Sequence, residues 1–350
     1  MSKPLFHVYT SGRVITPAKV IGSCALLLTI LAVIAAISMF VGPSGSSTLH
    51  LWNSILALWN TDNPGLSDTD RIILFNIRLP RIIFAGIVGA TLSLAGVVFQ
   101  ALLRNPLADP YILGVYGGSA VGAIVAIMTG LSALPFGISG LSFLGASLTI
   151  IFLFTIAGTG RAMPANTLLL AGVIMNAFFS AAIMFLITIS KSTEIHSIMF
   201  WLMGDLSVAT AREIAFTGVF LVSGFLAVYT CARPLNLIVT GEETAMQLGV
   251  NVGRTKIILF VIASLVTAAA ISVSGIIGFV GLMIPHIVRL LFGSDHRLLL
   301  PASVLFGAAF LVAADSVART VMAPAELPVG VITALCGAPY FVYLLKRKSV

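Results

Sequence analysis

Charged residues along this chain are separated by long apolar intervals, and the lengths of these intervals match helices that cross a membrane. A helix needs about 20 consecutive apolar residues to span the hydrocarbon core of a bilayer. The intervals hold ten such spans, in the following order: about 20–41; Arg81 to Arg104; two spans between Asp109 and Arg161, around a turn at 134–137; Arg161 to Lys191; Glu213 to Arg233; a full span and a short span broken by glycines and Pro285 between Lys256 and Arg289; Arg297 to Asp315; and Glu326 to Lys346.

The composition leads to the same fold class. Of the 350 residues, 59% are hydrophobic and 9% are charged, and the mean hydropathy is +1.10, whereas soluble domains carry about 25% charged residues. We therefore expect an all-α integral membrane protein with a single polytopic domain of ten helices over 20–346. A short segment, 1–19, precedes this domain and a tail, 347–350, follows it. The first apolar run is too long for a signal-peptide core and is expected to stay attached.

The positive charges predict the orientation of the spans. An even number of spans places both termini on one side of the membrane. If that side is the cytoplasm, most of the 19 Lys and Arg residues fall on the inner side, as the positive-inside rule requires. The net charge of +7 then reflects topology, and binding to nucleic acid need not be invoked.

Three segments between the spans predict helices outside the bilayer or at its surface. The outer loop 42–79 is expected to contain a short helix, and the outer segment 191–205 is expected to lie on the membrane. The main inner loop, 233–254, contains the sequence GEETAMQLGVNVGR, which reads as a soluble amphipathic helix with its acidic residues at the start. Residues Glu242 to Gly249 are the obvious place for a partner to exert force, although an ordinary solvated helix fits the same pattern.

Few residues in the spans carry chemistry. Asp315 and Arg319 are spaced as an interfacial ion pair on one helix face, and the three cysteines, Cys24, Cys231 and Cys336, lie far apart without metal-like spacing. The chain contains no Walker A motif for phosphate binding and no carboxylate near mid-membrane. Active transport would therefore require ATP hydrolysis on another polypeptide. An ion-coupled transporter or channel acting alone, and a membrane-embedded enzyme, are the alternatives.

Three motifs at span boundaries combine proline with polar groups. RNPLADP (104–110) and GRAMPAN (160–166) lie on the predicted inner side, where prolines either cap helices or form constrictions that open and close. RLPR (78–81) places two arginines on the predicted outer side, where the positive-inside rule disfavours positive charge. Together with Arg319 they could bind acidic groups of an external partner through forked hydrogen bonds.

Several long motifs resemble the FecCD-type permease subunits of ABC importers for iron-siderophores, haem and vitamin B12. The resemblance covers roughly residues 70–346. The motifs are RLPR, AGxxGxxLSLAGxxxQ ending at Gln100, LLRNPLADPYILGVxxG from Leu102, FWLMGDL from Phe200, GEETAMQLG from Gly241, SGIIGFVGLMIPHIVR ending at Arg289, and AELPVGVITALCGAPYF ending at Phe341.

The resemblance implies the vitamin B12-importer-like permease fold in the bacterial inner membrane, with both termini cytoplasmic. It implies a second permease copy, two ATP-binding subunits that hold ATP and Mg, and a periplasmic substrate-binding protein, while this chain itself binds no cofactor. It leaves open whether the cargo is a siderophore, haem or cobalamin, and whether the second copy is identical or a paralogue.

The resemblance also assigns roles to particular residues of this sequence. They are docking of the binding protein by Arg78, Arg81 and Arg319; cytoplasmic gates at Asn105, Pro106 and Leu107 and at Arg161, Pro164 and Asn166; coupling to the ATPase by Glu242, Glu243, Gln247, Leu248 and Gly249; and contact with the pathway by Gln100 and Tyr116. Tyr116 stands where the family commonly has a small residue, which makes it relevant to cargo choice.

Overall fold

The computed structural model describes residues 15–42, 68–157, 165–207 and 210–348. Within these ranges the chain is helical and contains no strand. Seven helices are long and apolar enough to cross a membrane, and three shorter apolar helices complete the ten that the sequence predicts. The ten are α1 (Pro17–Phe40), α4 (Leu79–Leu102), α5 (Val115–Met128), α6 (Gly137–Ala157), α7 (Ala165–Ile189), α9 (Ala211–Thr230), α12 (Val252–Ser274), α13 (Val280–Phe292), α14 (His296–Ala318) and α15 (Val329–Lys348).

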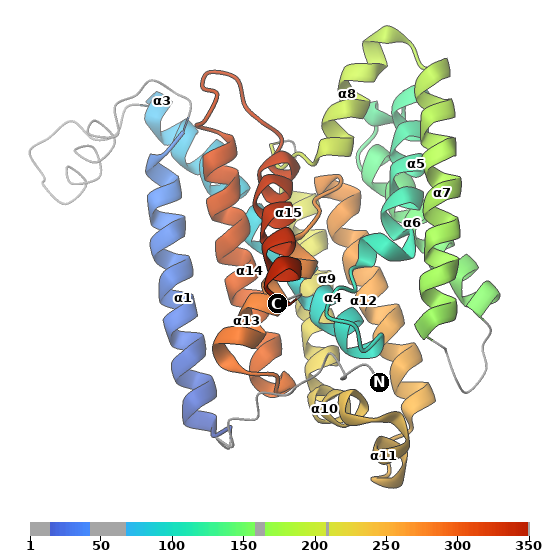
Figure 1. The fold of residues 1–350 in the computed structure, drawn as a ribbon. Helices are drawn as coiled ribbons and strands as arrows, with labels where there is room; N and C mark the ends of the chain where they lie inside the picture. Colours follow the sequence, from blue (N-terminus) through green and yellow to red (C-terminus); the bar gives the residue numbers. More distant parts are fainter. Residues whose placement is uncertain (1–14, 43–67, 158–164, 208–209, 349–350) are drawn as a thin grey trace, which may run out of the picture.

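Short helices lie between these spans, mostly at the two ends of the bundle (Figure 1). One end carries α3 and α8 and is called the α8 end below. The other carries α10 and α11 and is called the α11 end. The short helices are α3 (Asp68–Arg71), η1 (Ile72–Arg78), η2 (Pro110–Leu113), η3 (Leu131–Ala133), α8 (Ser192–Met203), α10 (Ala232–Thr240) and α11 (Glu242–Gln247).

The core of the bundle is built around α4, which packs against α9, α12, α13 and α14. Small residues let the backbones approach closely, as is usual for helices packed in lipid. A Cβ atom on Gly89 would collide with the backbone carbonyl of Gly307 in α14, and one on Gly96 would collide with the carbonyl of Gly281 in α13. These glycines fix the distance at which α4 meets its neighbours.

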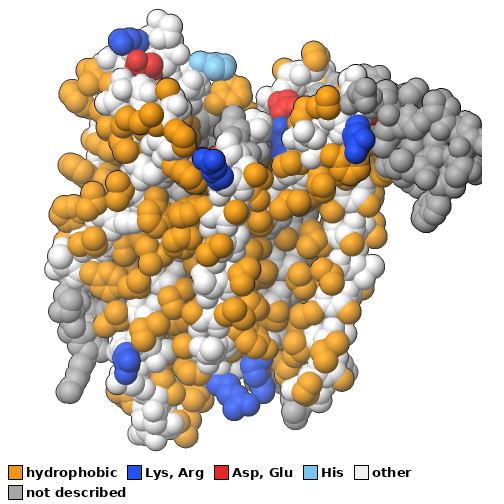
Figure 2. Space-filling view, turned by 180° about the vertical axis from the view of Figure 1, so that it is seen from behind, with side chains coloured by type: hydrophobic (Ala, Val, Ile, Leu, Met, Phe, Trp, Pro, Cys, Tyr) orange, Lys and Arg blue, Asp and Glu red, His pale blue; other side chains and the backbone are white. Residues whose placement is uncertain are grey.

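The outer surface matches a bilayer. Hydrophobic side chains cover the middle of the face shown in Figure 2, and the Lys, Arg, Asp and Glu side chains gather toward its two ends. Large apolar side chains such as Phe178 and Met184 on α7 are well exposed. In water this surface would be unfavourable, whereas in lipid it needs no cover.

Two segments differ in detail from the sequence-based expectation. The break between the seventh and eighth spans is made by Gly275 and Phe279, both at φ +67, whereas Pro285 lies inside α13 without ending it. The inner loop forms two helices, α10 and α11, where one was expected. They separate because Gly241 ends α10 and begins α11.

Candidate functional site

The α10–α11 element, residues 232–249, projects from the α11 end of the bundle (Figure 1). A small apolar core formed by Ile238, Ala245 and Val252 holds its two helices against the start of α12. Glu242 adds an ion pair to Lys256 of α12, with Nζ and Oε1 2.9 Å apart. The element is therefore anchored to α12 on its inner face.

The opposite face of α11 is exposed. Glu243 and Gln247 are exposed there, and the Leu248 side chain is 62% exposed beyond the apolar band of the bundle. Gly249 adopts φ +85, which turns the chain back toward α12. Met246 is 55% exposed beside Leu248, so the projection carries adjoining apolar side chains outside the apolar band, as contact surfaces for other proteins do.

A second attachment joins α10 to the beginning of α14. The Asn236 amide donates to Asp295 at 2.9 Å and accepts a hydrogen bond from the backbone N–H of His296 at 2.9 Å. Asp295 also caps α14 and pairs with Arg297. Burial alone would raise the pKa of Asp295, but hydrogen bonds from Arg297 and Asn236 outweigh burial and lower the pKa to about 2. The α10–α11 element is therefore attached to α14 as well as to α12.

The predicted gate segment 105–107 follows the end of α4. Arg104 has φ +47, and the backbone N–H of Asn105 donates to the carbonyl of Gln100 at 3.1 Å. This arrangement is a Schellman-type helix end in which arginine occupies the position usual for glycine. The Asn105 side chain accepts from the N–H of Leu107 at 2.9 Å, Pro106 is buried, and Leu107 is exposed.

The second predicted gate is only partly described. Arg161 and Pro164 lie outside the described residues, and Asn166 is exposed in the first turn of α7. The structure therefore gives no contact between the two predicted gates.

The two pathway candidates are buried inside the single chain. The Tyr116 hydroxyl donates to the carbonyl of Ile277 at 3.3 Å, and its ring packs edge-on against Tyr111. Gln100 bonds to α13 through its side-chain amide. Within this chain both side chains satisfy polar groups, Tyr116 at the α12–α13 break and Gln100 in α13, and their contact with a pathway stays a prediction.

The three predicted docking arginines are also buried, with Arg78 3%, Arg81 9% and Arg319 2% exposed. Arg81 approaches both oxygens of Asp315 at 2.9 to 3.1 Å and reaches Glu326 at 2.6 Å. This differs from the expectation that the arginines are presented to an external partner. Two carboxylates of the same chain, Asp315 and Glu326, pair with Arg81, and docking of an external partner by these arginines stays a prediction.

The remaining arginines of this cluster bond to the end of α1. The predicted ion pair of Asp315 and Arg319 is present, with Nε and Oδ2 3.1 Å apart. Arg319 also donates to the Ser38 hydroxyl at 2.8 Å, and Arg78 donates to the carbonyl of Met39 at 2.6 Å. The cluster therefore joins α1, α4 and α14 at the α8 end.

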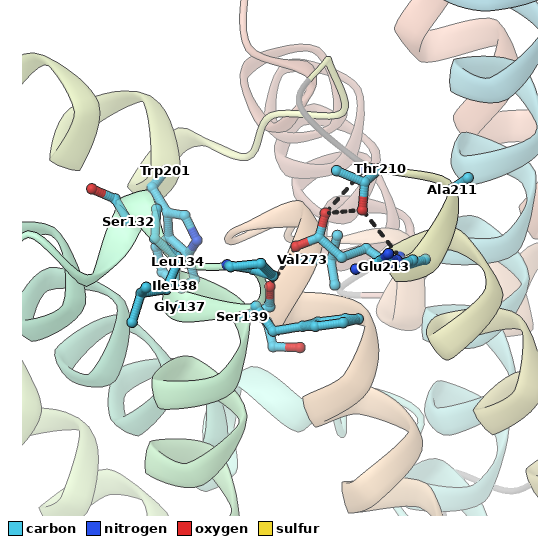
Figure 3. A pocket seen from close by; sticks show the side chains of 14 residues that line it. Ser132, Leu134, Gly137, Ile138, Ser139, Trp201, Thr210, Ala211, Glu213 and Val273 are labelled. Atoms are coloured by element: carbon cyan, nitrogen blue, oxygen red, sulfur yellow. Dashed lines mark hydrogen bonds between the residues drawn. The ribbon is translucent and has the colours of Figure 1, made fainter.

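A cavity of about 610 Å³ opens at the α8 end between α6, α8, α9 and α12. Trp201, Phe136 and Leu134 supply apolar walls. Glu213 lies across the cavity from Trp201 and is already bonded by Thr210 and Ser139 (Figure 3). Within the described residues, no group of three or more His, Cys, Asp and Glu side chains could hold a metal ion here or elsewhere.

Comparison with known proteins identifies the family. A model of the FecCD transport family matches residues 28–347. The chain belongs to the FecCD transport family. This FecCD permease is 46% identical to the cobalamin import system permease protein BtuC of Halobacterium salinarum, over 82% of this chain and 76% of that one. It is 39% identical to the hemin transport system permease protein HmuU of Yersinia pestis, over 97% of this chain and 98% of that one.

A solved structure supports the fold of this FecCD permease. It is described as an inward-facing conformation of a metal-chelate type ABC transporter, and it matches with a TM-score of 0.80 and 33% identity over 95% of this chain and 100% of the other. The prediction of the family and of its multi-pass helical fold is therefore confirmed.

Several residues that position the candidate sites of the FecCD permease were not singled out from sequence. Asn236 and Asp295 join α10 to α14, and Glu326 completes the arginine cluster. Asp295 precedes the ninth span at the position of a helix N-cap, which is a readable signal. Asn236 and Glu326 carry no local signal, since their partners lie far away along the chain.

Proposed function

We propose that this chain is the permease subunit of an ABC importer that moves a metal chelate (an Fe(III)-siderophore or haem) or cobalamin from the periplasm to the cytoplasm. It works in the bacterial inner membrane as a homodimer with cytoplasmic termini. ATP and Mg bind to two separate ATP-binding subunits, and a periplasmic binding protein delivers the cargo. The names of the relatives support this range of cargo, because they include cobalamin and hemin permeases.

The observation that carries the proposal is the exposed face of α11. This face lies outside the apolar band, so lipid does not cover it, and it combines Glu243 and Gln247 with Leu248 and Gly249. The inner face of the element is fixed to α12 by the Glu242–Lys256 ion pair and to α14 by Asn236. An ATPase that moves against α11 would thus move two membrane helices together.

Alternating access needs a cytoplasmic constriction that opens and closes, and the predicted gate residues are assigned to it. The segment 105–107 begins where α4 ends, and Leu107 is exposed. We assign Asn105, Pro106 and Leu107 to one cytoplasmic gate and the Arg161, Pro164 and Asn166 stretch to a second gate. The turn is held by two backbone hydrogen bonds, from Asn105 to Gln100 and from Ala108 to Asn105, and by the Asn105 side chain. These few bonds can rearrange at modest cost.

The arginine cluster supports docking of the binding protein only if its internal ion pairs rearrange. Glu326 is the accessible member, since its side chain is 35% exposed, whereas Asp315 is buried. An acidic residue of the binding protein would displace Glu326 from Arg81 and keep the guanidinium paired. Docking by Arg78 and Arg319 would require α1 to release them.

The function is tested at α11 by a pair of matched substitutions in the permease assembled with its ATP-binding subunits and the binding protein. Leu248→Glu should abolish ATP-driven transport and weaken ATPase association, because it places a charge in the contact. Leu134→Glu is the control for ATPase association alone, since Leu134 is 57% exposed at the opposite, α8 end. The double charge reversal Glu242→Lys with Glu243→Lys should have the same effect as Leu248→Glu. Vesicle transport of haem, cobalamin or a siderophore by the permease alone, without nucleotide, would contradict the proposal and favour an ion-coupled transporter or channel.

A further inference from the structure

Pro285, inside α13, removes one backbone hydrogen bond from that helix. In an α-helix the N–H of residue 285 would donate to the carbonyl of residue 281, but proline has no N–H. The carbonyl of Gly281 is therefore left without its usual donor inside the helix. It lies in the bundle interior, where an unpaired carbonyl is costly.

The side chain of Gln100 supplies the missing donor from α4. Its Nε2 atom donates to the carbonyl of Gly281 at 3.3 Å and to the carbonyl of Leu282 at 3.1 Å. The approach is possible because Gly96, one turn earlier on α4, has no side chain between the two backbones. The glycine and the glutamine together adapt α4 to the proline of α13.

Arg289 fixes the orientation of this amide. Its Nη2 atom donates to Oε1 of Gln100 at 3.0 Å, so the oxygen of the amide faces Arg289 and the nitrogen faces the carbonyls. Arg289 lies in the last turn of α13, one turn after Pro285. Both ends of the Gln100 amide thus bond to the same helix.

The backbone of Gln100 is in turn bonded to the candidate gate. Its carbonyl accepts the N–H of Asn105 at 3.1 Å. At the other end of this chain of contacts, α13 leads within three residues to Asp295, which Asn236 of α10 holds at 2.9 Å. A continuous series of bonded groups therefore runs from the α10–α11 element, through α13, to the gate segment.

We propose that Gln100 and Arg289 are positioning residues that carry movement of the α10–α11 element to the gate at 105–107. This inference rests on the proposed function, in which a nucleotide-driven subunit moves α11. Since the Gln100 amide bonds to α13 and its carbonyl bonds to Asn105, a shift of α13 changes the support of the gate segment directly.

The test measures access to the gate in the assembled transporter, permease with its ATP-binding subunits, in lipid nanodiscs. Cys24, Cys231 and Cys336 are replaced by serine, Leu107→Cys is introduced, and its reaction rate with a water-soluble maleimide is measured without nucleotide and with ATP and vanadate. When Gln100 and Arg289 are both present (the native pair), the reaction rates without nucleotide and with ATP and vanadate should differ by about fivefold or more. Fivefold is the lower end of typical coupling between two sites. Gln100→Met and Arg289→Met should each bring the ratio of rates close to one.

Two further variants separate coupling from simple loss of stability. Ser119→Ala removes a buried hydrogen bond to Ser142 between α5 and α6, and it should keep the native ratio. Gln100→Met combined with Arg289→Met should have no greater effect than either change alone, since the two residues act as one unit. If one methionine variant fails to assemble with the ATP-binding subunits, the ratio of maleimide reaction rates in the other variant tests the inference.

The outcomes distinguish this inference from the proposed function. A native ratio in an assembled Gln100→Met or Arg289→Met transporter would overturn the inference while leaving the proposed function intact. Absence of any nucleotide effect with the native pair, together with no ATPase association, would instead overturn both.

Discussion

Arg81 of α4 and Asp315 of α14 form a buried ion pair, in which Nε and Nη2 of the arginine approach the carboxylate at 2.9 to 3.1 Å. Arg319 shares the same carboxylate. One carboxylate therefore compensates two buried guanidinium groups, and Glu326 compensates Arg81 from the more exposed side.

We expect Asp315→Ala to destabilise the protein by about 3–5 kcal/mol, because it leaves buried positive charges without their partner. Thermal unfolding of the detergent-solubilised permease measures the effect. Glu326→Gln is the matched control and should cost about 1 kcal/mol or less, since Glu326 is 35% exposed. Equal costs for the two variants would contradict the view that Asp315 is the centre of the cluster.

Gly96→Ala should separate α4 from α13. The added Cβ atom would meet the carbonyl of Gly281, which is rigid backbone, and overpacking of this kind costs about 1–3 kcal/mol. Gly22→Ala on α1 is the control, because nothing lies within 4 Å of a Cβ atom built there. The unfolding temperatures of the two variants in detergent should differ. A neutral Gly96→Ala would show that the two helices can move apart freely.

Arg104→Gly should stabilise the end of α4 by about 0.5–1 kcal/mol or leave it unchanged. Arginine there has φ +47, and glycine adopts such a conformation without steric cost. Arg104→Ala keeps the strain and should give no gain, so the comparison isolates backbone conformation from loss of the charge. A stabilisation by alanine equal to that by glycine, measured by thermal unfolding, would contradict this interpretation.

Asp295 should make stability depend on pH in acid. Its pKa in the folded protein is lowered to about 2 from 3.8, so the unfolded chain binds the proton more tightly than the folded chain does. The stabilisation, about 2 kcal/mol, is complete above about pH 4 and is lost as the pH falls through about 2. Unfolding followed between pH 2 and pH 6 should show this loss in the parent. Asp295→Asn should reduce it, and an unchanged slope in that variant would refute the assignment.

The sequence alone determined the class of structure and its span order. The apolar intervals predicted ten helices, and the described helices begin and end within a few residues of the predicted limits. This works because the length of an apolar run is a local property, set by the thickness of the bilayer. The long motifs were equally local, and they identified the family.

Tertiary structure alone decided which polar groups meet. Gln100 and Arg289 are 189 positions apart, and Arg81 and Asp315 are 234 apart, so no spacing rule pairs them. The three arginines of the cluster, together with Gln100 and Tyr116, are buried against partners of the same chain, and no local pattern in the sequence shows those partners. In a lipid-embedded bundle, a polar side chain must find its hydrogen-bonding partner inside the protein, and only helix packing determines which partner lies within reach.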